Sequence, residues 1–170
     1  MKSFIVFFLA AFGLQAACVS DVECNPVVEE PLDPSVYYEY EISREHRKNP
    51  ATDKPFKPVI LNLQVAFTKQ QLREGLMNRM DLPENHGMLF DFGSSQVQRM
   101  WMKNTLIPLD MLFIDEDGFI KKIHAHAVEK DLTRISSDDP VRFVIEINAE
   151  EAERLNIKVG DRLNLQQLGY

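Results

Sequence analysis

Residues 99–115 read RMWMKNTLIPLDMLFID, and they place the only tryptophan of the chain, a Lys-Asn pair and a proline between two apolar runs. Proline disfavours the helical conformation of the residue before it, so Pro108 predicts an extended or turn segment with residues 103–105 in a bend. Residues 111–114 then restart a buried strand. Bends of this kind hold side chains at fixed places on a rigid scaffold. The segment therefore predicts polar side chains presented at one bend between buried strands.

Further strands are predicted on both sides of this segment. Residues 59–67 alternate apolar and polar side chains, the two-residue period of a half-buried strand. The most secure hairpin joins 111–114 to 119–127 through Asp-Glu-Asp-Gly, whose glycine supplies a positive φ. The remaining predicted strands are 88–92, 97–103, 141–147 and 162–165.

Two short helices are predicted from their caps. Thr68 and Gln71 have the spacing of a capping box, and Gly75 is expected to weaken or end that helix early. Asn148 is placed to cap a second helix over residues 149–155. About seven short strands with two short helices predict a mainly β (α+β) fold, a compact β-barrel or sandwich. A doubly wound α/β fold is disfavoured, because its parallel strands need longer helices between them.

Three blocks of sequence carry a resemblance to a known family. They are GLMNRMDLPENHGMLFDF (75–92), WMKNTLIPLDMLFID (101–115) and GFIKKI (118–123), in which packing alone would not dictate the polar residues. Over about residues 63–165 the chain resembles domain-of-unknown-function family 192, also called uncharacterised protein family 0127. The resemblance implies a small β-rich domain, often behind an export signal, without an assigned reaction.

The composition limits the classes of partner. A length of 170 residues predicts one domain. The net charge is −7, with 19 basic residues scattered among 26 acidic ones. Binding to a nucleic-acid backbone requires a concentrated basic surface, so no nucleic-acid partner is expected.

Residues 1–17 read as a signal peptide. Lys2 is followed by the apolar run FIVFFLAAFGL and then by two alanines, the order of a charged region, a hydrophobic region and a cleavage site. An N-terminal membrane anchor that is never cut is the alternative. The apolar run is too short to span a bilayer as a helix. We therefore expect an exported protein in the periplasm or another extracytoplasmic compartment.

Cleavage after residue 17 would leave Cys18 at the mature N-terminus, which resembles the lipid-attachment site of bacterial lipoproteins, although Gln15 stands where that pattern favours leucine. The competing interpretation is a disulfide between Cys18 and Cys24, the other cysteine. The two exclude each other. Contact with a membrane is expected only through the signal or a lipid at Cys18.

Residues 18–58 are acidic and contain six of the nine prolines, the composition of a tether or loosely ordered arm. Within this arm Val36, Tyr37, Tyr38 and Tyr40 could dock on the domain or form a short strand. The predicted organisation is therefore a signal peptide at 1–17, a tether at 18–58 and a single domain at 59–170.

The candidate ligand-binding residues are Arg79, Trp101, Lys103, Asn104 and Asp110. Cationic and amide groups in one concavity suit an anionic or polyhydroxylated ligand, and an indole face suits a sugar or a peptide side chain. In the competing interpretation the two cations pair with carboxylates to fix the bend while Trp101 fills the core.

His124 and His126 are weaker candidates for a metal site. Two residues apart on a strand, they are expected on one face, and a zinc or copper site would need a third ligand such as His86, Asp110 or a methionine. The alternative is a histidine pair on a polar outer face. Most methionines stand where core residues are expected, so no cofactor is predicted.

The sequence contains no Gly-x-Ser-x-Gly, Walker or His-Glu-x-x-His motif. The first functional hypothesis is therefore a non-catalytic exported domain that binds a small polar ligand, glycan or peptide. One alternative is a metal-assisted enzyme that uses His124, His126 and Asp110. The other is a structural partner in a cell-envelope assembly.

Overall fold

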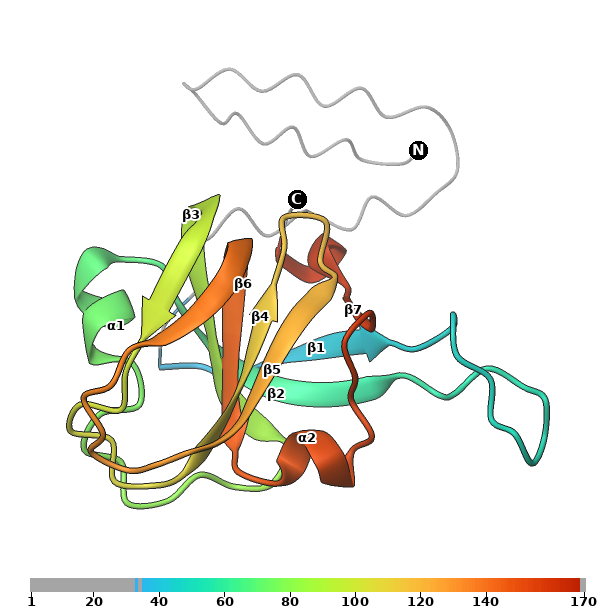
Figure 1. Cartoon of the computed structure of the whole chain (residues 1–170), viewed down its shortest axis with the longest axis horizontal. Helices are drawn as coiled ribbons and strands as arrows, with labels where there is room; N and C mark the ends of the chain where they lie inside the picture. The colour runs from blue at the N-terminus through green and yellow to red at the C-terminus, as the bar shows by residue number, and fades with distance from the viewer. Residues whose placement is uncertain (1–32, 34, 169–170) are drawn as a thin grey trace, which may run out of the picture. The chain divides into compact units, whose positions relative to one another are not determined.

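Seven strands form one curled sheet in the order β5-β4-β6-β3-β2-β1-β7 (Figure 1). The computed structural model describes residue 33 and residues 35–168. The strands are β1 (Tyr38–Ser43), β2 (Val59–Ala66), β3 (His86–Met100), β4 (Leu109–Ile114), β5 (Ile120–Ala127), β6 (Ile135–Asn148) and β7 (Arg162–Leu163). Two short helices, α1 (Lys69–Glu74) and α2 (Glu151–Arg154), and a 3-10 turn, η1 (Leu165–Leu168), complete the described elements.

The curl brings the two edges of the sheet together at one end. The N–H of Ile120 donates to Asp161 O at 2.9 Å, and the N–H of Leu163 donates to Gly118 O at 2.8 Å. An isolated bridge joins Phe119 and Arg162 beside them. Unpaired edges invite association with other chains, so this contact also protects one end of both edges.

Both faces of the central strands are buried. One apolar cluster draws on all seven strands and on α2, which places it inside the curl. A second cluster covers the opposite face, where α1 and the segments after α1 and β3 pack over Phe90, Met111 and Phe113. Successive residues of a strand point to opposite faces, and along β6 Phe143 joins the first cluster and Val144 the second.

Gly75 lets the chain pass closely over the second face. Its φ is +47°, and a β-carbon there would lie 2.9 Å from Phe90 Cζ and 3.9 Å from Glu146 Oε2. Gly75 also ends α1, as predicted, and Thr68 and Gln71 form the predicted capping box. The cap prediction for α2 is wrong, because Asn148 Nδ2 instead donates to Leu82 O at 2.9 Å.

The mainly β fold with about seven strands and two short helices is confirmed, and so is the hairpin of β4 and β5. The sheet also includes a strand ahead of residue 59. In β1, Tyr40 and Ile42 are fully buried, and the strand pairs with β2 in antiparallel register. A short strand was one of the two alternatives that the sequence left open for this segment, because its buried residues alternate with acids.

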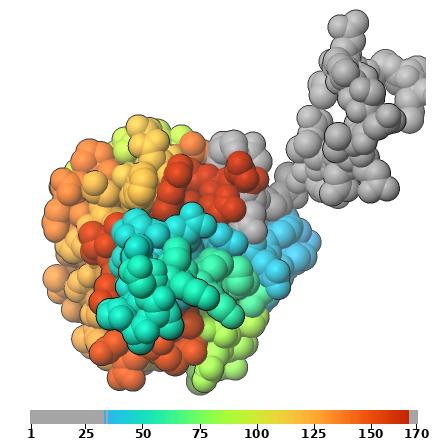
Figure 2. Space-filling view, turned by 90° about the vertical axis from the view of Figure 1, so that its right-hand side faces the viewer, coloured from blue at the N-terminus to red at the C-terminus, as the bar shows by residue number. Residues whose placement is uncertain are grey.

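Residues 44–57 also pack against the rest of the described chain, and Figure 2 shows them beside the C-terminal segment. Arg47 Nε and Nη2 donate to the buried carboxylate of Asp161 at 2.8 and 2.7 Å. Arg44 Nη1 donates to Leu155 O at 2.8 Å. Residues 31–170 accordingly belong to one compact unit that contains all seven strands and both clusters.

The predictions for residues 1–17, Cys18 and Cys24 lie outside the described residues. Within the described part of the chain, no helix is long and apolar enough to cross a membrane.

Candidate functional site

Two cationic side chains lie close to the ring of Trp101, just after β3. Lys103 Nζ is 5.2 Å from the centroid of its ring, and Arg134 Cζ is 4.0 Å from it. Neither cation forms an ion pair with any residue that the structure describes. Attraction between a cation and an indole face holds both side chains while leaving their N–H donors free for a ligand.

A pocket of about 550 Å³ opens beside this cluster, between β5 and the loop at 128–134. Its lining includes Met102, Lys122, His124, His126, Arg134 and Asp138. Lys122 Nζ donates to Asp138 Oδ2 at 2.6 Å and to Ser136 O at 2.8 Å. Arg134 and Asp131 also line the pocket, and neither forms an ion pair with a described residue, so the pocket offers one free cation and one free carboxylate.

The turn that carries Lys103 and Asn104 is fixed by backbone hydrogen bonds to two other loops. The N–H of Asn78 donates to Asn104 O at 2.9 Å. The N–H of Met102 donates to Asp131 O at 3.0 Å, and that of Lys130 to Thr105 O at 3.1 Å. Asn104 adopts a left-handed φ of 55°, a conformation that asparagine tolerates better than most residues.

The guanidinium of Arg79, unlike the ammonium group of Lys103, is held by hydrogen bonds to other side chains. Its guanidinium donates to Gln64 Oε1 and, at 3.1 Å, to the hydroxyl of Tyr37. Gln64 Nε2 in turn donates to Ser35 O at 3.1 Å. Arg79 thus ties the segment before β1 to β2, and it neighbours the Trp101 turn only through the backbone of Asn78.

Asp110 is buried, and its carboxylate accepts hydrogen bonds from two backbone N–H groups. Leu109 pairs with Ala127 and Met111 with His124, so a bulge sets Asp110 opposite two residues of β5. The N–H of His126 donates to Asp110 Oδ1, and the N–H of Ala152 donates to Oδ2, both at 3.0 Å. This carboxylate therefore holds the bulge and the start of α2.

The five predicted residues are only partly brought together. Trp101 and Lys103 are in contact, and Asn104 shares their turn. Arg79 and Asp110 have partners elsewhere. Arg134 was not among the predicted residues, because nothing in its local sequence shows that it folds back onto Trp101.

The bulge also interrupts the alternation between His124 and His126. His126 has a φ of 55° and is exposed, whereas His124 is half-buried. Both line the pocket beside Trp101. Among the described residues, no group of three His, Cys, Asp or Glu side chains is arranged to hold a metal ion.

Glu146 is a buried carboxyl group that the sequence analysis did not single out. It pairs with Met88 on β3 and Met111 on β4, so its side chain faces the second apolar cluster. Its carboxyl group has no hydrogen-bond or ion-pair partner among the described residues, and burial raises its pKa to about 8. The signal was Val144, which stands on the same face of the strand as Glu146 while Phe143 and Ile145 stand on the other, a pattern expected when both faces are buried.

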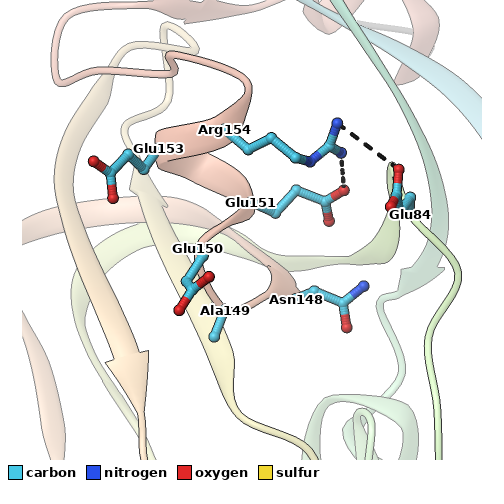
Figure 3. Close-up of a pocket in the computed structure, with 7 residues that line it drawn as sticks. All are labelled: Glu84, Asn148, Ala149, Glu150, Glu151, Glu153 and Arg154. Carbon is cyan, nitrogen blue, oxygen red and sulfur yellow. Dashed lines mark hydrogen bonds and ion pairs between the residues drawn. The ribbon is translucent and has the colours of Figure 1, made fainter.

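A second pocket, of about 480 Å³, lies at α2 (Figure 3). Arg154 reaches across it to Glu151 Oε1 at 2.6 Å and to Glu84 at 3.9 Å. The N–H of Asn85 donates to the same Glu151 oxygen. Arg154 therefore holds α2 to the segment before β3, whereas Glu151 Oε2 is buried without a hydrogen-bond partner among the described residues.

Three comparisons place the chain among known proteins. The family model DUF192, described as Uncharacterized ACR, matches residues 51–165. A crystal structure of a provisionally assigned transcription regulator from Sinorhizobium meliloti 1021 is 39% identical, with a TM-score of 0.65 over 76% of this chain and 95% of that one. A protein of unknown function from Novosphingobium aromaticivorans DSM 12444 is 28% identical, with a TM-score of 0.67 over 81% and 94%. No curated protein matches the chain.

Proposed function

The chain belongs to the DUF192 family, whose description names no reaction, and we propose that it is a non-catalytic exported domain that binds a small polar ligand beside Trp101. The observation that carries the proposal is the proximity of the indole ring to both Lys103 and Arg134, two cations without carboxylate partners in the described chain. Such a group suits a ligand with an acidic substituent, because charge-assisted hydrogen bonds to carboxylate or phosphate are strong.

The adjoining pocket has the size expected for such a ligand. Small-molecule sites commonly enclose about 300–1,000 Å³ and combine apolar walls with a few convergent polar groups. Here Met102 contributes apolar surface, while His124 and Arg134 contribute ring and guanidinium nitrogens. An acidic sugar or the carboxylate end of a peptide would place its charged group at Arg134, next to Trp101.

The first test is ligand-dependent thermal stabilisation. Glucuronic acid, glucose 6-phosphate and a dipeptide are added separately to the unit at 31–170. A ligand present at 100 times its Kd stabilises the native state by about 2.7 kcal/mol. We expect at least one probe to raise the melting temperature by roughly 5–10 °C and to change the fluorescence of Trp101, the only tryptophan.

Variants locate the effect. R134A and K103A should lose the stabilisation while melting near the wild-type temperature without ligand. K121A is the matched control, because Lys121 is an exposed lysine of β5 that lines neither pocket described above. Equal stabilisation of R134A and wild type, or no response of wild type to any probe, would contradict the proposed site.

Export is a separate part of the proposal, supported by the leader-like residues 1–17. In a bacterial host that exports the full chain, we expect the recovered protein to lack residues 1–17. Mass spectrometry of its first peptide should show either a lipid on Cys18 or a loss of two hydrogens from a Cys18–Cys24 disulfide. Recovery of a chain that still begins at Met1 would contradict export by cleavage.

A further inference from the structure

One oxygen of a buried carboxylate in α2 lacks a hydrogen-bond donor. Glu151 is 3% exposed, and its Oε1 accepts from Arg154 Nη2 at 2.6 Å and from Asn85 N at 2.5 Å. Its Oε2 is buried and has no partner in the part of the chain that the structure describes. A buried charged acceptor without a donor costs stability, so this atom calls for a donor from outside the described chain.

Glu151 is one of the residues that line the pocket of about 480 Å³ at α2. Figure 3 shows its carboxylate among the other lining side chains, with one oxygen toward Arg154 and the other turned away from it. A pocket of this volume is in the range of small-molecule sites. The oxygen without a donor therefore belongs to a site that is large enough for a small ligand.

The charged side chains of this pocket are mostly acidic. Four acidic residues and one basic residue line it, a balance of −3; they are Glu84, Glu150, Glu151, Glu153 and Arg154. Arg154 is already paired with Glu151 and, at 3.9 Å, with Glu84. Glu150 and Glu153 form no ion pair among the described residues. A ligand that brings positive charge therefore suits the pocket.

The placement of the acids distinguishes between kinds of cation. A metal ion needs several ligands that converge on one point, whereas an ammonium group carries three donors that can each meet a separate acceptor. Within the described residues, no three His, Cys, Asp or Glu side chains are arranged to hold a metal ion. In Figure 3 the carboxylates of Glu150 and Glu153 lie apart from that of Glu151. Spread acceptors of this kind favour an amine with more than one ammonium group.

We propose that the pocket at α2 binds a small aliphatic amine with two or more ammonium groups. One ammonium donates to Glu151 Oε2, and another contacts the exposed carboxylates of Glu150 and Glu153. Hydrogen bonds between ammonium and carboxylate groups are strengthened by their charges. Arg154 already shows that a cationic N–H group fits beside this carboxylate. Because Oε2 is covered, we expect the half-exposed Arg154 side chain to shift when the ligand enters.

A buried water molecule is the simplest other donor to Glu151 Oε2, but it brings no charge to balance the acidic lining. The amine site also differs from the site beside Trp101. The two pockets share no lining residue, so this inference does not rest on the proposed function.

Titration calorimetry with putrescine, a four-carbon diamine, tests the inference. The unit at 31–170 is used at constant ionic strength, because it contains every described strand and helix. We expect one putrescine to bind per chain, roughly two- to fivefold more tightly than butylamine, which lacks the second ammonium group. Added salt should weaken the binding, and 1,4-butanediol should not bind.

Two variants separate the two ammonium contacts. E151Q should bind both amines roughly tenfold or more weakly, because it removes the buried charged acceptor. E150Q/E153Q should bind putrescine only as tightly as butylamine and leave butylamine binding unchanged. E129Q is the matched control, because Glu129 is an exposed acid that lines neither this pocket nor the one beside Trp101.

Absence of putrescine binding to wild type would overturn the site and leave a water molecule as the donor to Glu151 Oε2. Wild-type affinity in E151Q would do the same. If E151Q does not fold, the exposed pair decides, and unchanged putrescine binding by E150Q/E153Q would overturn the proposal. R134A should bind putrescine like wild type, whereas loss of binding in R134A would place the amine beside Trp101 and overturn the site at α2.

Discussion

Glu146→Gln is expected to raise the melting temperature of the unit at 31–170 at neutral pH. It should also remove much of the decline of this melting temperature as the pH rises from about 4.5 to 8. Glu146 lies between Met88 and Met111 under the Gly75 turn, and burial raises its pKa from 4.5 to about 8. Each unit of difference between the folded and unfolded pKa corresponds to about 1.4 kcal/mol. The gain over wild type near pH 8 should therefore exceed that at pH 4 by roughly 3–5 kcal/mol.

The direction follows from the protons bound in each state. Below pH 4.5 Glu146 is protonated in both the folded and the unfolded chain, so it adds no pH dependence. Between pH 4.5 and 8 the folded state keeps the proton that the unfolded state loses, and stability falls as the pH rises. Glutamine has nearly the same shape and does not titrate, so E146Q escapes this loss.

The measurement is the melting temperature of wild type and E146Q at intervals from pH 4 to pH 9. The difference between the two curves isolates Glu146 from the other titrating groups. E39Q is the matched control, because Glu39 is an exposed carboxylate of β1 and its curve should stay parallel to that of wild type. Parallel curves for E146Q and wild type would show that Glu146 is hydrated in the native state.

Asp110→Ala is expected to destabilise the unit by roughly 3–5 kcal/mol, because it removes two hydrogen bonds to a buried charged acceptor. The carboxylate accepts from His126 N and Ala152 N, both at 3.0 Å, and is 1% exposed. Its loss leaves two backbone donors unsatisfied, at the bulge of β5 and at the start of α2. D110N should lie between wild type and D110A, since its amide has one acceptor oxygen.

Chemical denaturation measures the loss, and hydrogen exchange locates it. The amides of His126 and Ala152 should be protected in wild type, and both should exchange much faster in D110A. D117A removes an exposed aspartate from the β4–β5 turn and should leave both the stability and these amides unchanged. Wild-type stability of D110A would show instead that Asp110 is free to contact a ligand.

The local features of the fold were predictable because neighbouring residues determine them. The capping box of Thr68 and Gln71 and the end of α1 at Gly75 depend on contacts within a few positions. The β4–β5 hairpin follows from a short turn sequence between two apolar runs. The sequence did not decide whether β1 forms, because the stability of this strand comes from pairing with β2 and not from its own composition.

The candidate site was predictable only where its members are adjacent in sequence. Trp101 and Lys103 stand two positions apart, and Lys103 lies in the turn closed by the bond from Thr105 N to Met102 O. Arg134 comes from a distant loop, and its position depends on the backbone bonds that join the loops at 101–108 and 128–134. No local pattern encodes such a contact.

By itself the amino-acid sequence determined the β-rich class, the hairpin, the cap of α1 and the family resemblance, since each depends on local chemistry or on recognisable blocks. Only the tertiary structure decided which polar groups remain free. In the folded chain Asp110 accepts hydrogen bonds from two backbone donors, and apolar side chains surround Glu146. Lys103 and Arg134 lie beside Trp101 without an ion-pair partner among the described residues. The physical reason is that hydrogen bonding and desolvation depend on groups brought together from distant parts of the chain.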